Sequence, residues 1–129
     1  MSNHKIGRIN WTIAKRAHIK CADIVITDNQ LIHIQRRHNA ELSLLNISAF
    51  DYVKMVVDNY DQIREKRDNA IMLVKTNPMP PHDTCVLELQ FNKTKQEWNI
   101  KTAQPRNNIE KNRILWNKKR MRNKNASLV

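Results

Sequence analysis

The chain has 129 residues, the usual size of one domain, and its 23 Lys and Arg residues against 12 Asp and Glu give a net charge of +11. No run of about 18 apolar residues is present that could span a bilayer, and the polar residues 1–7 contain no hydrophobic core of a secretion signal. Binding of cations to a phosphate polymer releases counterions, so this charge favours a nucleic acid partner, with a membrane surface as the alternative.

Glycine and cysteine usage excludes several kinds of site. Gly7 is the only glycine, and both the P-loop and the dinucleotide-binding loop need several glycines for their turns. Cys21 and Cys85 lie far apart without a C-x-x-C pairing, which predicts two free thiols rather than a zinc site or a disulfide framework. The five histidines match no standard metal-binding spacing, so we expect no metal and no cofactor.

Three helices are predicted in the first half of the chain, each after a capping residue. The first covers residues 11–19 after Asn10, and a short β-branched run at residues 24–26 follows it. The second begins at Thr27, where a Gln three residues later completes a capping box, and ends near Asn39. The third begins at Ser48 and carries a clear amphipathic stripe, which consists of Val53, Val56, Val57 and Tyr60.

After residue 60 the apolar period changes from 3.6 to 2 residues, which predicts strands. The expected strands are residues 61–65 (at an edge), 70–76, 84–91 and 97–104, with the proline-rich residues 77–81 as a loop. A basic helix is expected from Asn107 to about Arg122. This order predicts an α+β fold in which N-terminal helices pack on a four-stranded antiparallel sheet. Residues 1–124 would form one domain, and residues 125–129 a frayed tail.

The most unusual local feature is the segment HIQRRH at residues 33–38. His33 and Arg37 are four residues apart and share a helical face, whereas His38 lies on the apolar stripe of the same helix. An imidazole transfers protons near neutral pH, and a guanidinium stabilises charge on a phosphate in a transition state, so these residues are candidate catalytic groups. The alternative is that His38 packs in the core and the arginines form a solvated face.

The predicted sheet supplies four more candidates. Glu88 lies on the polar face of a central strand, where it could act as a general base, and Lys101 flanks it on the returning strand. Lys75 ends an apolar strand, and the hydroxyl of Thr102 could hold a phosphate oxygen. The alternatives are solvated strand faces and weak cross-strand salt bridges.

The C-terminal segment carries the densest positive charge. Between residues 106 and 124 eight Lys and Arg residues face one acid, Glu110, which gives 8 − 1 = +7 of the total charge. A like-charged run of this density repels itself unless an anion binds it, which predicts phosphate contacts. Trp116 could stack on a base or anchor the segment to the core. The candidate RNA-binding residues are Arg106, Arg113, Trp116, Lys118, Lys119, Arg120 and Arg122.

Residues 25–38, VITDNQLIHIQRRH, resemble the opening motif of the phage barnase–EndoU–colicin–RelE-like (BECR) nuclease domains. The ILW of residues 114–116, followed by Lys118 and Lys119, is similar to the close of these domains, and the resemblance covers about residues 5–122. His33, Arg37 and His38 match the family motif, whereas Asn39 stands where a proline often follows. The resemblance implies the four-stranded fold and metal-independent RNA cleavage, in which the 2′-OH attacks its own phosphate and leaves a 2′,3′-cyclic phosphate.

The resulting hypothesis is a toxin-like or phage-encoded ribonuclease that acts on RNA, with tRNA among the candidate substrates, in a bacterial cytoplasm. A cognate immunity or antitoxin protein would be a second partner. The alternatives are a non-catalytic RNA- or DNA-binding module and a structural phage protein that binds nucleic acid.

Overall fold

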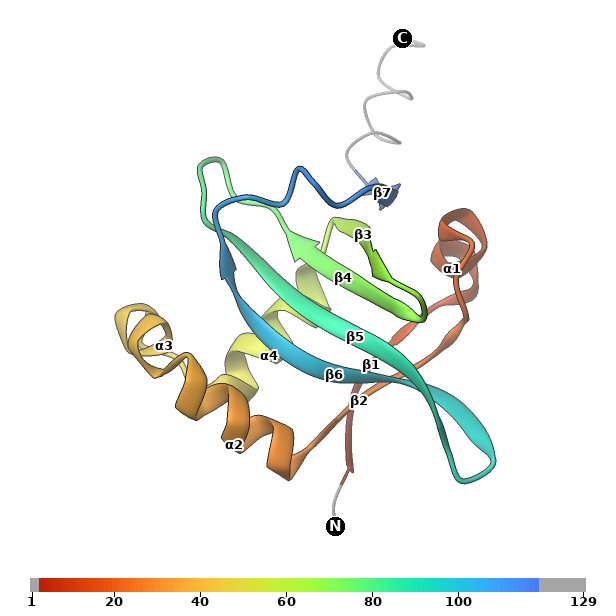
Figure 1. Cartoon of the computed structure of the whole chain (residues 1–129), viewed down its shortest axis with the longest axis horizontal. Coiled ribbons are helices and arrows are strands. Elements are labelled where there is room, and N and C mark those ends of the chain that lie inside the picture. The colour runs from red at the N-terminus through yellow and green to blue at the C-terminus, as the bar shows by residue number, and fades with distance from the viewer. Residues whose placement is uncertain (1–2, 119–129) are drawn as a thin grey trace, which may run out of the picture.

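In a computed structural model, residues 3–118 form a seven-stranded mixed sheet and four helices (Figure 1). The strands lie in the order β1-β2-β6-β5-β4-β3-β7. No helix in this described part is long and apolar enough to cross a membrane. The elements in chain order are β1 (Asn3–Ile9), α1 (Trp11–Ala17), β2 (Ala22–Thr27), α2 (Asp28–Arg37), α3 (Asn39–Leu45), α4 (Ala49–Asn59), β3 (Gln62–Arg67), β4 (Ala70–Lys75), β5 (His82–Asn92), β6 (Lys95–Arg106) and β7 (Ile114–Asn117).

The sheet corrects the predicted fold. Strands β3 to β6 form an antiparallel meander over the segments expected to be strands, but the four-stranded sheet is wrong because three more strands extend it. At one side β2 joins β6 in parallel, with Ile24 beside Trp98, and β1 pairs with β2. At the other side β7 pairs with β3. The chain remains α+β, with a wider and mixed sheet.

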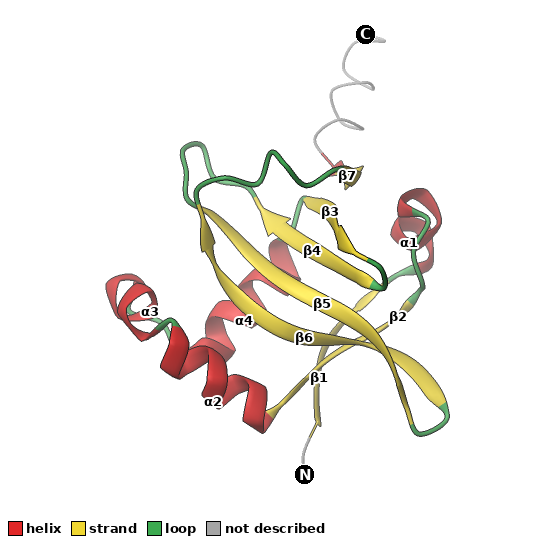
Figure 2. Cartoon of the chain, in the orientation of Figure 1, coloured by secondary structure: helices red, strands yellow, loops and turns green. Residues whose placement is uncertain are grey.

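Helices α1, α2 and α4 (Figure 2) begin where the sequence predicts, and capping hydrogen bonds confirm the three starts. The side chains of Asn10, Thr27 and Ser48 each accept a bond from a backbone N–H three residues later, at 2.9, 3.1 and 3.1 Å. Helix α2 ends at Arg37, and the short helix α3, which the sequence analysis missed, follows almost at once.

The predicted basic C-terminal helix, residues 107–122, is wrong over its described part. Residues 107–113 form an irregular loop, and residues 114–117 are strand β7. Pairing with β3 therefore overrides the helical preference of this segment. Residues 119–122, which include Lys119, Arg120 and Arg122, lie outside the described residues.

The main core lies between one face of the sheet and the helices. Tyr52, Val53 and Val56 of α4 are fully buried against the sheet. Figure 1 shows α4 behind β4, β5 and β6. The other face carries a second, smaller cluster, in which Ile109 from the loop covers Met72, Val74 and Val86.

The single glycine is explained by the packing of β1 on α4. A Cβ atom on Gly7 would lie 2.5 Å from Cγ1 of Val57, whose β-branched side chain has little freedom to move. Gly7 is thus required for close approach of a strand and a helix, and not for a phosphate-binding turn.

Candidate nucleic acid interface

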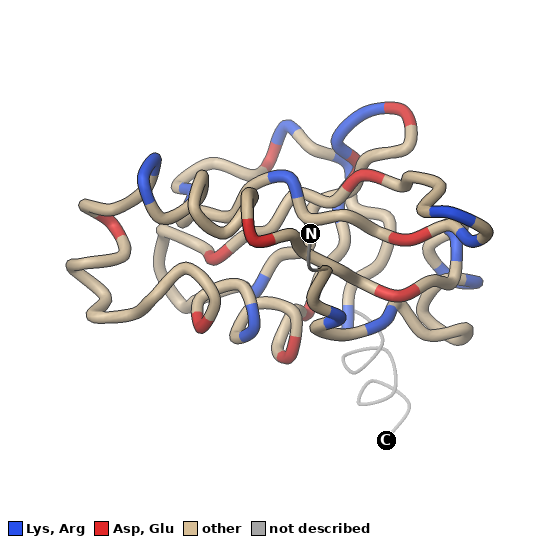
Figure 3. Tube along the Cα trace, turned by 90° about the horizontal axis from the view of Figure 1, so that it is seen from below, with Lys and Arg blue, Asp and Glu red and all other residues tan. Residues whose placement is uncertain are grey.

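Lys and Arg residues are distributed along the whole chain (Figure 3), so net charge alone does not locate a site. One group differs from the rest because it combines residues from two distant segments. Lys66 and Arg67 end strand β3, Arg106 ends β6, and Lys111 lies in the loop that follows β6. These four residues are called the basic face below.

The buried side chain of Arg64 holds the loop that carries Lys111 against the sheet. This side chain is only 5 % exposed, and its Nη1 donates to the carbonyl oxygens of Ile109 at 3.2 Å and Asn112 at 2.7 Å. Its Nε donates to Oε1 of Gln62 at 2.9 Å. The N–H of Glu65 also donates to the carbonyl oxygen of Arg113 at 2.7 Å, and the side-chain amide of Asn112 donates to the carbonyl oxygen of Glu65 at 3.0 Å. The loop is therefore fastened across the sheet, which places Lys111 near β3.

Lys66 is the extra residue of a β-bulge in β3, between Glu65 and Arg67. Bulges change the direction of a side chain and are frequent beside functional sites. Burial lowers the pKa of the Lys66 ammonium, and the nearby charges of Arg106, Lys111 and Arg67 lower it further. The protonated lysine is thus destabilised by its cationic neighbours, and a bound anion would relieve this repulsion.

Few negative groups balance the basic face. Glu88 lies 3.5 Å from Nη2 of Arg67, and its other oxygen accepts a bond from Gln90 at 2.9 Å. Among the described residues, the buried Nε atom of Arg106 has no hydrogen-bond partner. A buried donor without a partner is costly.

The candidate residues predicted on the sheet, Thr102, Lys101 and Lys75, lie at different places in the strands. Thr102 is directly opposite Val86 across β5 and β6, so it shares the face covered by the loop. Lys101 is the extra residue of a second bulge, and its carbonyl oxygen accepts a bond from Gln30 at 3.2 Å. Lys75 lies at the other end of β4, where it donates to Asn77 at 2.8 Å.

The histidine segment lies on α2 and is not joined to the basic face. His33 and Arg37 are exposed, and His38 is 6 % exposed at the junction of α2 and α3. Nδ1 of His38 lies 3.3 Å from a carboxylate oxygen of Glu41. Within residues 3–118, no hydrogen bond or ion pair links these three residues to Lys66, Thr102 or the other basic residues. The structure therefore does not bring the two predicted groups of catalytic residues into contact.

The described residues of the C-terminal candidate set have separate environments. Arg113 forms an ion pair with Glu65 at 3.0 Å, which lowers the pKa of the Glu65 carboxyl. The Trp116 ring contacts Tyr60 edge-on at 5.7 Å between centroids, and Lys118 is exposed. Only Arg106 of this set belongs to the basic face.

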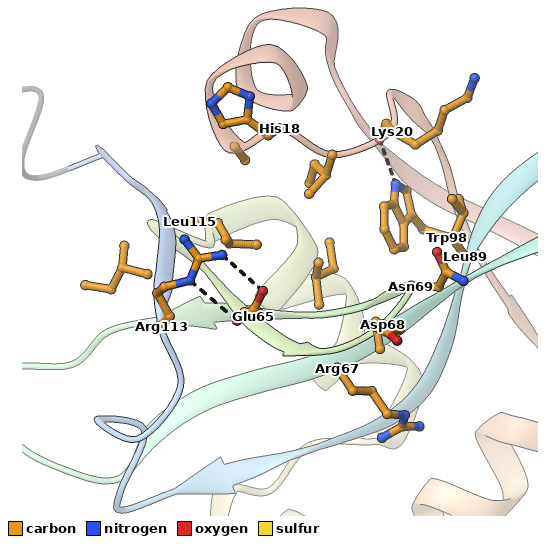
Figure 4. A pocket seen from close by; sticks show the side chains of 15 residues that line it. His18, Lys20, Glu65, Arg67, Asp68, Asn69, Leu89, Trp98, Arg113 and Leu115 are labelled. Carbon is orange, nitrogen blue, oxygen red and sulfur yellow. Dashed lines mark hydrogen bonds and ion pairs between the residues drawn. The ribbon is translucent and has the colours of Figure 1, made fainter.

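A pocket of about 420 Å³ lies on the other side of the β3–β4 hairpin (Figure 4). Its walls come from the end of α1, the hairpin at residues 65–71, and residues 113–115. Nε1 of Trp98 donates to the carbonyl oxygen of Lys20 at 2.9 Å, which fixes the segment after α1. This cavity is called the hairpin pocket below.

Sequence analysis did not single out Lys66, Arg67 or Lys111. Residues 64–68, REKRD, mix both charges and are typical of a solvated turn, so this pattern does not indicate a cluster with Arg106 and Lys111. Lys111 was one of many cations in a segment predicted to be a helix. The one available signal was the position of two cations at the end of a strand of the predicted sheet.

No protein-family model, no curated protein and no solved structure matches this chain. Among the described residues, no group of three or more His, Cys, Asp and Glu side chains is placed to hold a metal ion.

Proposed function

We propose that the chain binds RNA, with the basic face as its contact surface for the phosphate backbone. The observation that carries the proposal is that Arg64 fastens residues 109–112 across the sheet, so that cations from two distant segments gather in one place. Arg67 is paired with Glu88, but Lys66, Arg106 and Lys111 form no ion pair with another described residue, and such an excess of cations is the typical footprint of a phosphate-binding surface.

A membrane surface is the weaker alternative for this charge. Proteins that bind anionic membranes usually combine cations with exposed apolar side chains that insert between lipids. The large exposed apolar residues of the described chain lie elsewhere, and none belongs to the segments that form the basic face. They are Trp11, Ile32, Leu44, Leu45, Phe50, Met79 and Phe91.

The test compares two triple variants by fluorescence anisotropy with a labelled single-stranded RNA over a series of salt concentrations. One variant combines Lys66→Ala, Arg106→Ala and Lys111→Ala. The control removes three exposed cations far from this face, with Lys15→Ala, Arg36→Ala and Lys93→Asn, where Asn suits the positive φ of residue 93.

We expect the first variant to lose most of its affinity, and its log–log salt slope to fall by about 0.7 for each lost phosphate contact. The control should keep the parent slope. Equal losses in both variants would show that net charge, and not this face, binds RNA. Stronger binding to anionic vesicles than to RNA would reject the proposal.

Metal-independent cleavage of the bound RNA is a second candidate function, favoured by Lys66. A lysine whose pKa is lowered by cationic neighbours can exchange a proton nearer to neutral pH than an ordinary lysine. In the proposed reaction a base removes the 2′-OH proton, and O2′ then attacks the adjacent phosphorus. The P–O5′ bond breaks and O5′ takes a proton, which leaves a 2′,3′-cyclic phosphate. Lys66, which lies near the guanidinium of Arg106, and the exposed His33 of α2 are the alternative groups for proton transfer.

Incubation with total RNA tests this second candidate. Cleavage should persist in EDTA, give cyclic phosphate ends and stop when the substrate lacks the 2′-OH. Loss of activity in Lys66→Ala but not in His33→Ala would assign proton transfer to the basic face, and the reverse result would assign it to α2. Cutting of DNA at a similar rate would reject the mechanism. A chain with this activity would act in the cytoplasm and would need a cognate inhibitor in the cell that makes it.

A further inference from the structure

The hairpin pocket adds a second surface to the proposed RNA-binding site. Its floor is apolar and includes Ile19, Leu89 and Leu115, whereas its rim carries charged and amide groups. A volume of about 420 Å³ lies within the range of about 300–1,000 Å³ typical of small-ligand sites, and polar and apolar groups contribute about equally to the lining. The pocket thus suits a flat ring that carries polar groups along its edge.

Hydrogen bonds fix the three walls of the pocket. The Lys20 carbonyl accepts from Trp98, and the N–H of Leu89 donates to the carbonyl oxygen of Asn69 at 2.8 Å. On the opposite side, Arg113 is held by the carboxylate of Glu65. Figure 4 shows these segments enclosing the cavity from different sides. A ligand would therefore enter a cavity that is already formed, with little ordering of the chain.

The polar rim has groups available for recognition. Asp68 and Asn69 are exposed at the hairpin turn, and neither side chain has a hydrogen-bond or ion-pair partner among residues 3–118. Lys20 is exposed on the facing segment, with its ammonium likewise free of a partner in the structure. The rim can thus accept hydrogen bonds from N–H groups on one side and donate to carbonyl or ring nitrogen acceptors on the other. Both kinds of group occur together on the edge of a nucleobase.

Arg67 connects the pocket to the basic face. It lines the pocket, but Figure 4 shows its guanidinium directed away from His18 and Lys20, toward the other side of the hairpin. There it lies near Glu88 and influences Lys66. A chain of nucleotides bound along the basic face would thus reach the pocket by passing around the end of one exposed hairpin.

We propose that the hairpin pocket accepts an unpaired nucleobase of the RNA whose backbone lies on the basic face. This inference rests on the proposed RNA binding and defines its substrate class as single-stranded RNA. A base that is paired in a duplex cannot turn into a pocket around the hairpin, because its polar edge and its faces are already occupied.

The test uses three 2′-O-methyl ligands of equal length, so that cleavage cannot consume them: a single strand, the same backbone without bases, and a duplex. The parent protein should bind the single strand about tenfold more tightly than the abasic strand, which is the usual order for one well-recognised base. It should also prefer the single strand to the duplex. Backbone amide signals of Asn69, Leu89 and Leu115 should shift in NMR spectra with the complete strand and not with the abasic strand.

Variants locate the effect. Asp68→Ala and Lys20→Ala should reduce the ratio of single-strand to abasic affinity, whereas the control Asp51→Ala, an exposed acid on α4, should leave that ratio unchanged. The triple variant of the basic face should lose affinity for the complete strand and for the abasic strand by the same factor. Equal binding of the complete and abasic strands by the parent would overturn the pocket inference but not the proposed function. Absence of binding to either strand would overturn the proposed function itself.

Discussion

His33 and His38 have the same side chain in very different environments. His38 is packed at the α2–α3 junction beside Glu41, whereas His33 is exposed on α2. We expect His38→Ala to lower the free energy of unfolding by about 1–3 kcal/mol, because a buried polar contact is lost. His33→Ala should leave it nearly unchanged. Urea unfolding of both variants measures the difference, and equal destabilisation would contradict the assigned environments.

Helical spacing is sufficient to predict which of these histidines is buried, because residues on the apolar stripe of α2 face the core. No comparable pattern exists for Lys66. Its neighbours Arg106 and Lys111 are distant in sequence, and their approach depends on hydrogen bonds from Arg64 to backbone carbonyl groups. Such a contact between a side chain and a remote backbone leaves no periodic signal in the sequence.

The buried side chain of Arg64 makes two of the hydrogen bonds that attach the loop at residues 107–113 to the sheet. Arg64→Ala would leave the carbonyl oxygens of Ile109 and Asn112 without their donor, and we expect a loss of about 1–3 kcal/mol or more in unfolding free energy. RNA affinity should fall as well, although Arg64 is buried, because Lys111 would no longer be held near Lys66. Urea unfolding and RNA anisotropy give the two readouts.

Arg113→Ala is the matched control for this element, because it removes an exposed ion pair with Glu65 at the same loop. Exposed ion pairs contribute little to the free energy of unfolding, so this variant should remain close to the parent in stability. A larger loss in Arg113→Ala than in Arg64→Ala would show that the loop is attached by its surface pair.

At the level of elements, local signals and long-range pairing were predicted with unequal success. The capping residues Asn10, Thr27 and Ser48 mark the helices, because a cap acts within one turn. Strand β7 was predicted as helix, since only its pairing with β3 makes it a strand. Strand β1 was missed because a bulge between Lys5 and Gly7 interrupts its alternation.

Across the whole molecule, Asp23 connects the N-terminal strands to the β5–β6 hairpin. Its carboxylate lies 2.7 Å from Nη1 of Arg8, 3.5 Å from Nζ of Lys5 and 3.4 Å from Nζ of Lys95. The hydrogen bond from Arg8 is the main reason that the pKa of Asp23 is below its ordinary value, with smaller contributions from the two lysines.

A lowered pKa in the folded state means that this carboxylate stabilises the fold above its unfolded pKa, near 3.8, and that the contribution is lost as pH falls through the folded pKa. Asp23→Asn should therefore be less stable than the parent at pH 6–7, and the two should converge in strong acid. Urea unfolding over a pH series measures this. A stability difference independent of pH would contradict the ion-pair explanation.

The strand order determines when, during synthesis and folding, the proposed RNA-binding surface is formed. Strand β2 can pair with β1 early, but its other edge is open to other strands until β6 is made, since Ile24 lies beside Trp98. Contacts between such distant segments form slowly, and sheets dominated by them typically fold in milliseconds to seconds. The basic face likewise joins Lys66 to Arg106 and Lys111, which a ribosome adds much later. Residues 106–124 carry +7 of the net charge of +11, so a growing chain would acquire both most of its positive charge and its binding surface only at the end of synthesis.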